Sequence, residues 1–261
     1  MTGDPYTDRT VLATEAYPDP TRLSARYSLY RYRQPALNLP AAGAALVRDA
    51  AGPVLDAGCG PGRHVAALRA DRPHRTVVAA DLSAGMVAAA GRPGIVADLA
   101  ALPVATGSCG AALAMHVLFH LTDPAAGLRE LARVVAPGGT VLVSTNASDD
   151  KAGLYELFRV AAREVPGMPA WEPDLARRLH VDRAVALAQR QFGAVERVDL
   201  VGDVVLPDPE PAVAFAASTR TWQPGDPFSR VLDRIRDRVG EVIARDGAFR
   251  FRTAVGILVC R

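Results

Sequence analysis

The sequence predicts an α/β fold in which a doubly wound, mostly parallel sheet carries helices on both faces. Two observations predict it: short apolar stretches alternate with helical ones between residues 54 and 144, and the first of them runs into a glycine-rich turn. Strands and helices that alternate at this spacing are typical of parallel sheets. Such sheets bind ligands beyond the carboxyl ends of their strands, so the residues after each strand are the candidates for function.

The alternation contains five expected strands. Each is a short apolar run that ends at a glycine or a polar residue, and we place them at 54–57, 76–80, 95–97, 111–115 and 140–144. Helices are expected at 41–50, at 63–69, after Ser83 as an N-cap, and at 124–135, where Pro137 and two glycines end the pattern.

The remaining segments flank this core. Residues 1–20 are rich in Asp, Thr and Pro without an apolar period, which predicts a flexible leader. Residues 148–193 lack a strand pattern and predict a helical insert or lid, with one helix at 182–192. Two further strands are expected at 195–206 and 250–260, on either side of a helix at 228–245. No linker divides residues 21–261, so we expect a single domain with core 41–147, the insert, and a C-terminal part 194–261.

Composition and charge exclude several classes of protein. The 261 residues are 49% hydrophobic and 22% charged, as in soluble globular proteins, and no apolar run approaches the ~20 residues of a membrane span. With 30 basic and 28 acidic residues the net charge is +2, so no nucleic-acid surface is expected. Lys151 is the only lysine, and we attribute the excess of arginine to codon bias rather than to an anion-binding surface.

The cysteines and the N-terminus indicate a cytoplasmic protein. Cys59, Cys109 and Cys260 are odd in number and far apart, which favours neither a disulfide framework nor a metal site. The first 20 residues are polar and acidic, unlike a signal peptide. We expect no membrane contact, no metal, and a monomer or homodimer.

The glycine-rich turn is the strongest single motif. Gly58, Gly60 and Gly62 alternate after a strand and open a helix, where a residue without Cβ lets the backbone approach a ligand closely. A dinucleotide fingerprint would need its third glycine at position 63, which is Arg63. Asp56, two residues before the turn, would repel a phosphate and attract a cation. A NAD-dependent dehydrogenase is therefore a distant alternative.

Four motifs in order resemble a class I S-adenosylmethionine-dependent methyltransferase of the small-molecule type. They are Asp-Ala-Gly-Cys-Gly-Pro-Gly at 56–62, an acid at Asp81, Ala-Asp-Leu at 97–99, and Ala-Pro-Gly-Gly-Thr at 136–140. The resemblance covers residues 54–145. It implies a Rossmann-like, seven-stranded sheet and S-adenosyl-L-methionine as the cofactor. Many relatives carry an acid at the start of the fourth strand where this chain has Gly110, but that position lies away from the ligand end.

The resemblance also implies roles for individual residues. The turn of Gly58, Gly60 and Gly62 would pass under the methionine part of the cofactor, with Asp56 near its amino group, through water or backbone. Asp81 would accept hydrogen bonds from both ribose hydroxyls, since a carboxylate offers two acceptor oxygens. The adenine would meet Leu82, Asp98 and the backbone N–H of Leu99, and Met115 would lie near the reactive methyl group.

Two histidines follow the fourth strand, where the family places the methyl acceptor. His116 comes directly after the strand and His120 lies one helical turn further on. A histidine with a pKa near 6.5 can accept a proton from a hydroxyl or amine at neutral pH. The alternatives are that His120 has a packing role, that His116 is structural, and that alignment of the acceptor suffices without a base. His64 and Arg63 are expected at the surface.

Aromatic residues outside the matched region are the candidates for acceptor binding. Tyr27 and Tyr30 precede the core, and Trp171 lies in the insert. Further candidates for a lid are Tyr155, Phe158, Met168 and Trp222. Aromatic cover would exclude water and attract a sulfonium through cation–π contact.

The sequence thus predicts an enzyme that moves a methyl group by in-line displacement to an O, N or C nucleophile of a small molecule. One alternative is an RNA-modifying methyltransferase on the same fold, which a dense basic patch would support. Another is a cofactor-binding protein without transfer activity.

Overall fold

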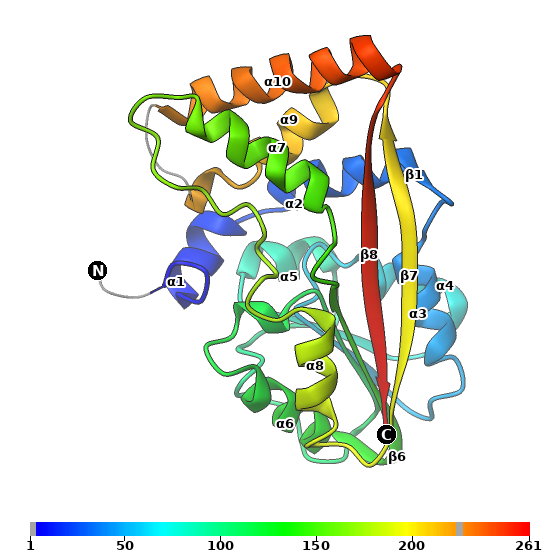
Figure 1. Cartoon of the computed structure of the whole chain (residues 1–261). Coiled ribbons are helices and arrows are strands. Elements are labelled where there is room, and N and C mark those ends of the chain that lie inside the picture. The colour runs from blue at the N-terminus through cyan, green and yellow to red at the C-terminus, as the bar shows by residue number, and fades with distance from the viewer. Residues whose placement is uncertain (1–3, 223–226) are drawn as a thin grey trace.

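The computed structural model describes residues 4–222 and 227–261, which form an α/β fold around one mixed sheet (Figure 1). The sheet has eight strands in the order β1-β7-β8-β6-β5-β2-β3-β4. Strands β2 to β6 are parallel, whereas β7 and β8 run antiparallel to their neighbours and β1 is antiparallel to β7. The order reverses between β5 and β2, which is the topological switch point where such sheets bind ligands.

The expected strands are present, with one addition. The strands are β1 Arg33–Gln34, β2 Val54–Ala57, β3 Val77–Asp81, β4 Gly94–Val96, β5 Cys109–Met115, β6 Val135–Asn146, β7 Val195–Leu206 and β8 Phe249–Cys260. The extra strand is β1, whose two residues pair with Val204 and Asp203 of β7. A strand of two residues is too short to show a periodic pattern in the sequence.

Helices cover both faces of the parallel part of the sheet. Strand β5 shows why, because all seven of its residues are buried. Ala111 and Leu113 contact the cluster formed with α3 and α4, and Ala112 and Ala114 contact the cluster formed with α6 and α8. The helix bounds are α3 Leu39–Leu46, α4 Arg63–Asp71, α5 Ala84–Ala90, α6 Pro124–Val134 and α8 Val181–Ala188.

Gly110 explains one departure from the sequence motifs. A Cβ at this position would overlap the carbonyl oxygen of Ala51, and the Gly110 N–H donates a hydrogen bond to the carbonyl of Pro53 at 2.8 Å. The start of β5 therefore packs directly against the loop that precedes β2, which leaves no room for an acidic side chain there.

A second layer of helices packs on the far ends of β7 and β8. These strands extend beyond the parallel sheet, and α10 Pro227–Asp246 lies across their ends together with α7 Ala152–Arg163 and α9 Glu210–Ala217 (Figure 1). Phe158, Phe215, Phe228 and Trp171 fill the core of this layer. Helix α9 has no counterpart among the helices expected from the sequence.

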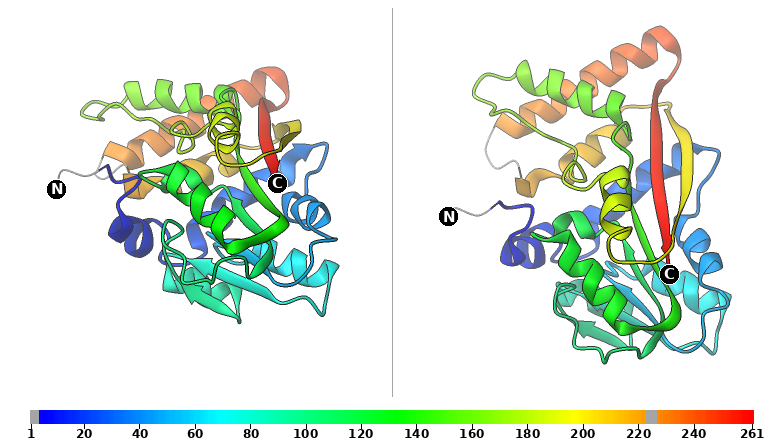
Figure 2. Two further views of the ribbon diagram at one scale, coloured as in Figure 1. Left: turned by 90° about the horizontal axis from the view of Figure 1, so that it is seen from below. Right: turned by 60° about the horizontal axis from the view of Figure 1, so that its bottom comes forward.

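The N-terminal segment, residues 4–20, forms helical turns where the sequence predicts a flexible leader over residues 1–20, of which residues 1–3 lie outside the described residues. Asp8 caps α1 Arg9–Val11, which continues into the π-helix η1 Leu12–Ala16, and then α2 Thr21–Ser28 and η2 Leu29–Tyr32 follow. Leu12 and Ala16 are buried. Helices α1 and η1 lie on the side of the molecule away from β7 and β8, whereas η2 packs next to β7 (Figure 2). The order of the N-terminal segment comes from contacts with distant residues, which a local pattern does not reveal.

We expect Gly85→Ala to loosen this segment selectively. Gly85 lies in α5, where alanine would otherwise favour the helix. However, a Cβ there would overlap the carbonyl oxygen of Pro18. Overpacking of about 1–3 kcal/mol corresponds to roughly 5- to 150-fold faster amide exchange in residues 12–17, which hydrogen-exchange mass spectrometry measures. Unchanged exchange in this segment would contradict the close packing of Pro18 on α5.

In the described ranges, no helix combines the length and the apolar character that a membrane crossing requires.

Candidate functional site

A cavity of about 480 Å³ lies at the carboxyl ends of the parallel strands. Each of the five strands contributes a lining residue at or just beyond its end: Gly58, Asp81, Asp98, His116 and Asn146. The volume is in the range of small-molecule sites, which are usually 300–1,000 Å³. The position is the one that the switch point between β5 and β2 predicts.

The glycine turn forms one wall of this cavity. Gly58 and Gly60 line it with φ angles of 75° and 50°, and a Cβ on Gly58 would overlap the side chain of Val117. Gly62 does not line the cavity. It precedes α4 with φ 82°, and its Cβ would lie 2.6 Å from Cα of Ala90, so this glycine allows α4 and α5 to approach each other.

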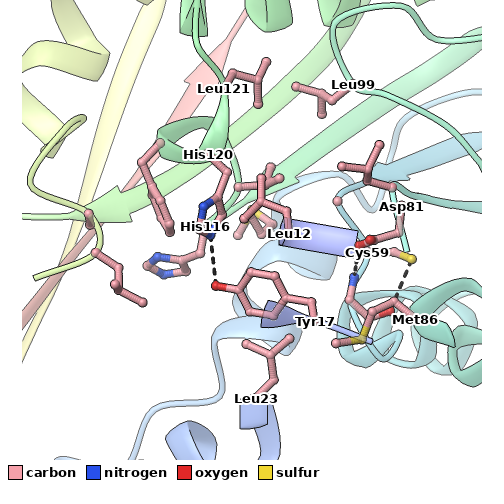
Figure 3. A pocket seen from close by; sticks show the side chains of 18 of the residues that line it. Leu12, Tyr17, Leu23, Cys59, Asp81, Met86, Leu99, His116, His120 and Leu121 are labelled. Atoms are coloured by element: carbon pink, nitrogen blue, oxygen red, sulfur yellow. Dashed lines mark hydrogen bonds between the residues drawn. The ribbon is translucent and has the colours of Figure 1, made fainter. Parts of the chain in front are cut away.

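Asp81 stands at the end of β3 beside the turn (Figure 3). Its Oδ2 accepts a hydrogen bond from the Gly60 N–H at 2.9 Å, and its Oδ1 accepts one from the Ser83 N–H at 2.9 Å. Burial raises the pKa of this carboxyl. Because a carboxylate oxygen accepts more than one hydrogen bond, each oxygen can still accept one from a ligand hydroxyl.

Asp56 is a buried carboxyl without a hydrogen-bond partner among the described residues. It is 1% exposed, and neither Oδ1 nor Oδ2 finds a donor. Burial, and then the charge of Asp81, raise the pKa of Asp56 to about 7. Asp56 lies in β2 and does not itself line the cavity. An ammonium group near this buried carboxyl would stabilise its ionised form and supply the missing hydrogen-bond donor.

The other expected cofactor residues also line the cavity. Leu82, Asp98, Leu99 and Met115 are among the lining residues. Asp98 Oδ1 accepts a hydrogen bond from the Ala100 N–H at 2.8 Å, and its Oδ2 forms an ion pair with Arg9 of α1. The N-terminal segment therefore closes the end of the cavity at which adenine is expected.

His120 anchors the N-terminal segment. Its Nδ1 lies 3.0 Å from the carbonyl oxygen of Tyr6, which can only accept, so Nδ1 is the donor. Its Nε2 lies 3.0 Å from the hydroxyl of Tyr17 (Figure 3). Burial lowers the pKa of His120 to about 4, so the ring is neutral and Nε2 accepts from Tyr17. Both ring nitrogens are thus engaged, and the packing alternative describes His120 better than the role of a base.

His116 faces the cavity from the end of β5. It adopts φ 58°, a left-handed conformation that is uncommon for a residue other than glycine. Burial, followed by the charges of Lys151 and His64, lowers the pKa of His116 to about 3. The imidazole is therefore neutral at physiological pH and a much weaker base than a free histidine. Its chemistry suits a hydrogen-bond acceptor more than a proton acceptor.

His64 differs from its expected place at the surface. It lines the cavity, its Nδ1 is buried without a partner among the described residues, and burial lowers its pKa to about 4. Arg63 is exposed, as expected, and its guanidinium lies 4.3 Å from the ring centre of Tyr27. Both side chains of the first turn of α4 therefore line the cavity, although Arg63 is also exposed to solvent.

The aromatic candidates divide into two groups. Tyr27, Tyr30 and Tyr155 line the cavity, together with Phe215 of α9, which the sequence does not single out. Trp171 does not reach the cavity, because it stacks on Phe158 with ring centres 5.3 Å apart. Phe158 and Met168 also belong to the core of the second layer, and the side chain of Trp222 is outside the described part of the chain.

The cavity fits S-adenosylmethionine by its donors and acceptors. The cofactor carries an ammonium group, two ribose hydroxyls and an adenine amino group. The lining offers the two oxygens of Asp81 and the carboxylate of Asp98. The partnerless carboxyl of Asp56 is not part of the lining but lies two residues before Gly58, where its charge can favour a nearby ammonium group. Gly58 and Gly60 supply the wall without side chains that a close approach to the backbone requires.

Comparisons with known proteins identify the family of this chain. A family model described as "Methyltransferase domain" matches residues 55–143. A demethylmenaquinone methyltransferase from Mycobacterium sp. (strain KMS) is 32% identical over 163 residues, which are 56% of this chain and 69% of that protein. An uncharacterized 37.1 kDa protein in a transposon of Streptomyces fradiae is 38% identical over 98 residues, which are 34% of this chain but only 28% of that protein.

A solved structure shows the same fold. It is a protein of Anabaena variabilis, named as a candidate methyltransferase of an antibiotic biosynthesis pathway. The match has a TM-score of 0.64 and 18% identity, and it covers 85% of this chain and 96% of the other. The ordered motifs, the cavity at the switch point and the mycobacterial relative lead to the same assignment. The chain therefore belongs to the class I S-adenosylmethionine-dependent methyltransferases.

Proposed function

We propose that this protein transfers a methyl group by in-line displacement to an O, N or C nucleophile of a small molecule. The observation that carries the proposal is the continuity of one cavity. The same space is lined by Asp81 and Asp98 at one end and by His116, Lys151 and Tyr155 at the other. A donor and an acceptor can therefore occupy it together.

Different residues would bind the cofactor and the acceptor in such a reaction. When bound, S-adenosylmethionine supplies a methyl group on a positively charged sulfur. Asp81 would hold its ribose, and Asp98 would accept from the adenine amino group. Asp56, behind the cavity lining, would act on its amino group through water or backbone. The acceptor would lie against His116 and the aromatic side chains of Tyr30 and Tyr155. Holding two reactants in line contributes up to roughly 7–11 kcal/mol in well-oriented cases.

The experiment uses methyl-labelled S-adenosylmethionine and a panel of phenols, amines, enols and carboxylic acids. We expect label to appear in at least one small molecule, with one S-adenosylhomocysteine formed per methyl group transferred. Binding of S-adenosylhomocysteine without transfer to any member of the panel would contradict the proposal and favour a binding protein.

His116→Ala tests how the acceptor is activated. Because the pKa of His116 is about 3, the ring is already neutral above pH 5, and we expect no inflection from it in kcat between pH 5 and 8. Loss of a hydrogen-bond acceptor should lower kcat/KM by about 10-fold, through KM. A fall of kcat by about 10²–10⁴, as for a lost general base, would contradict this role.

A further inference from the structure

Two described residues other than glycine have positive φ angles, and both line the acceptor end of the cavity. They are His116 with φ 58° and Lys151 with φ 56°. Side chains are uncommon in this backbone region, and residues held there gather at functional sites. The two side chains also interact electrostatically, since the charge of Lys151 contributes to the low pKa of His116. Lys151 is the only lysine in the chain.

The side chain of Lys151 is buried from solvent but belongs to the cavity lining. The side chain is 3% exposed and lines the cavity, whereas its ion-pair partner Asp150 does not line it. Strand β8 fixes the position of Asp150, because the Asp150 Oδ1 accepts a hydrogen bond from the Ala254 N–H at 2.9 Å. Lysine is almost never fully buried unless it is paired. Asp150 therefore keeps Lys151 charged and fixes the place of its ammonium group.

Tyr30 joins Lys151 at the same wall. The Lys151 Nζ donates a hydrogen bond to the Tyr30 hydroxyl at 3.1 Å, and Nζ lies 5.6 Å from the centre of the Tyr30 ring. An ammonium group has three donors, and Asp150 and Tyr30 account for two. The Tyr30 hydroxyl accepts from Lys151, so its own proton can be donated to a ligand. Lys151 and Tyr30 thus offer hydrogen-bond donors to one place in the cavity.

A fixed cation and a phenol, in a site with weak bases, suit an acceptor that is already anionic. His120 is engaged by Tyr6 and Tyr17, and His116 is a poor proton acceptor. An acceptor whose oxygen is already ionised needs neither histidine as a base. As the new bond to the methyl group forms, the electrons of the carbon–sulfur bond return to sulfur. A negative acceptor and a positive donor then become two neutral products, and no proton has to move.

We propose that Lys151 and Tyr30 form an oxyanion-binding subsite for the methyl acceptor, which is a small molecule with an ionised oxygen such as a phenolate, an enolate or a carboxylate. The subsite rests on the proposed function, since it defines the acceptor of that reaction. The oxygen itself is methylated in a phenolate or carboxylate. In an enolate the neighbouring carbon is methylated while the subsite holds the oxygen.

The test measures binding of two probe anions to the complex with S-adenosylhomocysteine. The probes are 4-nitrophenol, whose phenolate absorbs visible light, and benzoate. Nitrobenzene serves as the uncharged probe of similar shape. We expect the pKa of 4-nitrophenol to fall on binding, so that phenolate absorbance rises when protein is added below the pKa of the free probe. Preference for 4-nitrophenol over benzoate would indicate a phenolate or enolate, and the reverse order a carboxylate.

The variants separate this subsite from folding. Asp150→Asn/Lys151→Met removes both buried charges at once, so neither remains unpaired, and Tyr30→Phe removes one hydroxyl. Arg245→Met/Asp246→Asn is the matched control, because these neighbours form an ion pair with N···O 2.8 Å on the exposed end of α10. We expect the Asp150/Lys151 variant to bind the anions about 10- to 100-fold more weakly and to lose the pKa shift of 4-nitrophenol. Tyr30→Phe should cost about 3- to 10-fold.

Binding of nitrobenzene and of S-adenosylhomocysteine should stay unchanged in all three variants. The inference is overturned if neither anion binds the wild-type complex, or if the Asp150/Lys151 variant keeps the pKa shift. These results differ from failure of the proposed function, in which the wild type would not bind S-adenosylhomocysteine or would transfer no methyl group.

Discussion

Asp81→Asn is expected to weaken binding of S-adenosylhomocysteine by about 10²–10⁴-fold. Two hydrogen bonds to a charged acceptor contribute about 1.5–3 kcal/mol each, and asparagine presents one oxygen instead of two. The effect has a second source in the turn itself. Oδ1 and Oδ2 each accept from a backbone N–H, so an amide NH₂ group must face either Gly60 or Ser83. Isothermal titration calorimetry measures the change.

Asp71→Asn is the control for this variant. Asp71 accepts hydrogen bonds from Arg48 outside the cavity, so its loss should leave the affinity for S-adenosylhomocysteine unchanged. The far-ultraviolet circular dichroism of both variants should match the wild type. An Asp81→Asn protein that binds within threefold of wild type would contradict the assignment of Asp81 to the ribose.

Asp56→Asn is expected to stabilise the cofactor-free protein at pH 8 but not at pH 4. Burial raises the pKa of Asp56 to about 7 from 3.8. The carboxyl is protonated in both states at low pH. As pH rises from about 4 to 7 the unfolded chain ionises first, so folding loses free energy over that window. Three pH units at 1.36 kcal/mol each give an upper bound of about 4 kcal/mol, and we expect about 2–4.

Urea unfolding of wild type and variant at pH 4, 6 and 8 measures this difference. Asparagine can also change the free energy of unfolding by an amount that does not depend on pH. The informative quantity is therefore how the difference between variant and wild type changes with pH. A difference that is the same at pH 4 and pH 8 would show that Asp56 does not titrate in this range.

Cofactor binding should reverse the effect at the same residue. An ammonium group near Asp56 favours the ionised carboxylate and lowers its pKa. Binding of S-adenosylhomocysteine should therefore release about half a proton near pH 7, seen as a buffer-dependent calorimetric enthalpy. Asp56→Asn should release none, and equal release from both proteins would place the titrating group elsewhere.

The parallel sheet could be predicted because its signals are local. Each of the strands β2 to β6 contains an apolar run that ends at a glycine or polar residue, and the family motifs fall at those ends. Asp81 and Asp98 could be placed in the cavity for the same reason. The carboxyl ends of parallel strands meet at one edge whatever the rest of the chain does.

The parts that could not be predicted depend on contacts between distant residues. Leu12 and Ala16 are buried only because the N-terminal segment folds back over the cavity, and His120 is engaged only because Tyr6 and Tyr17 lie there. Trp171 and Tyr155 are both aromatic residues of the insert. The sequence around them does not reveal that only Tyr155 lines the cavity. Phe215 lies on a short helix that carries no motif.

Lys151 stands out in the sequence, but the sequence alone does not reveal its role. As the only lysine it is conspicuous in the composition, which by itself indicates codon usage. Its burial, its pairing with Asp150 and its left-handed backbone appear only in three dimensions. The absence of lysine from every other position makes this one position more informative.

A crystal structure of the complex with S-adenosylhomocysteine tests the central claim most directly. The predicted result has the ribose hydroxyls within hydrogen-bond distance of Asp81, the amino group on the side of Asp56, and the adenine beside Asp98 and Leu99. The sulfur should then face the part of the cavity lined by His116 and Lys151. A ligand bound outside this cavity, or one whose sulfur points away from His116, would contradict the account.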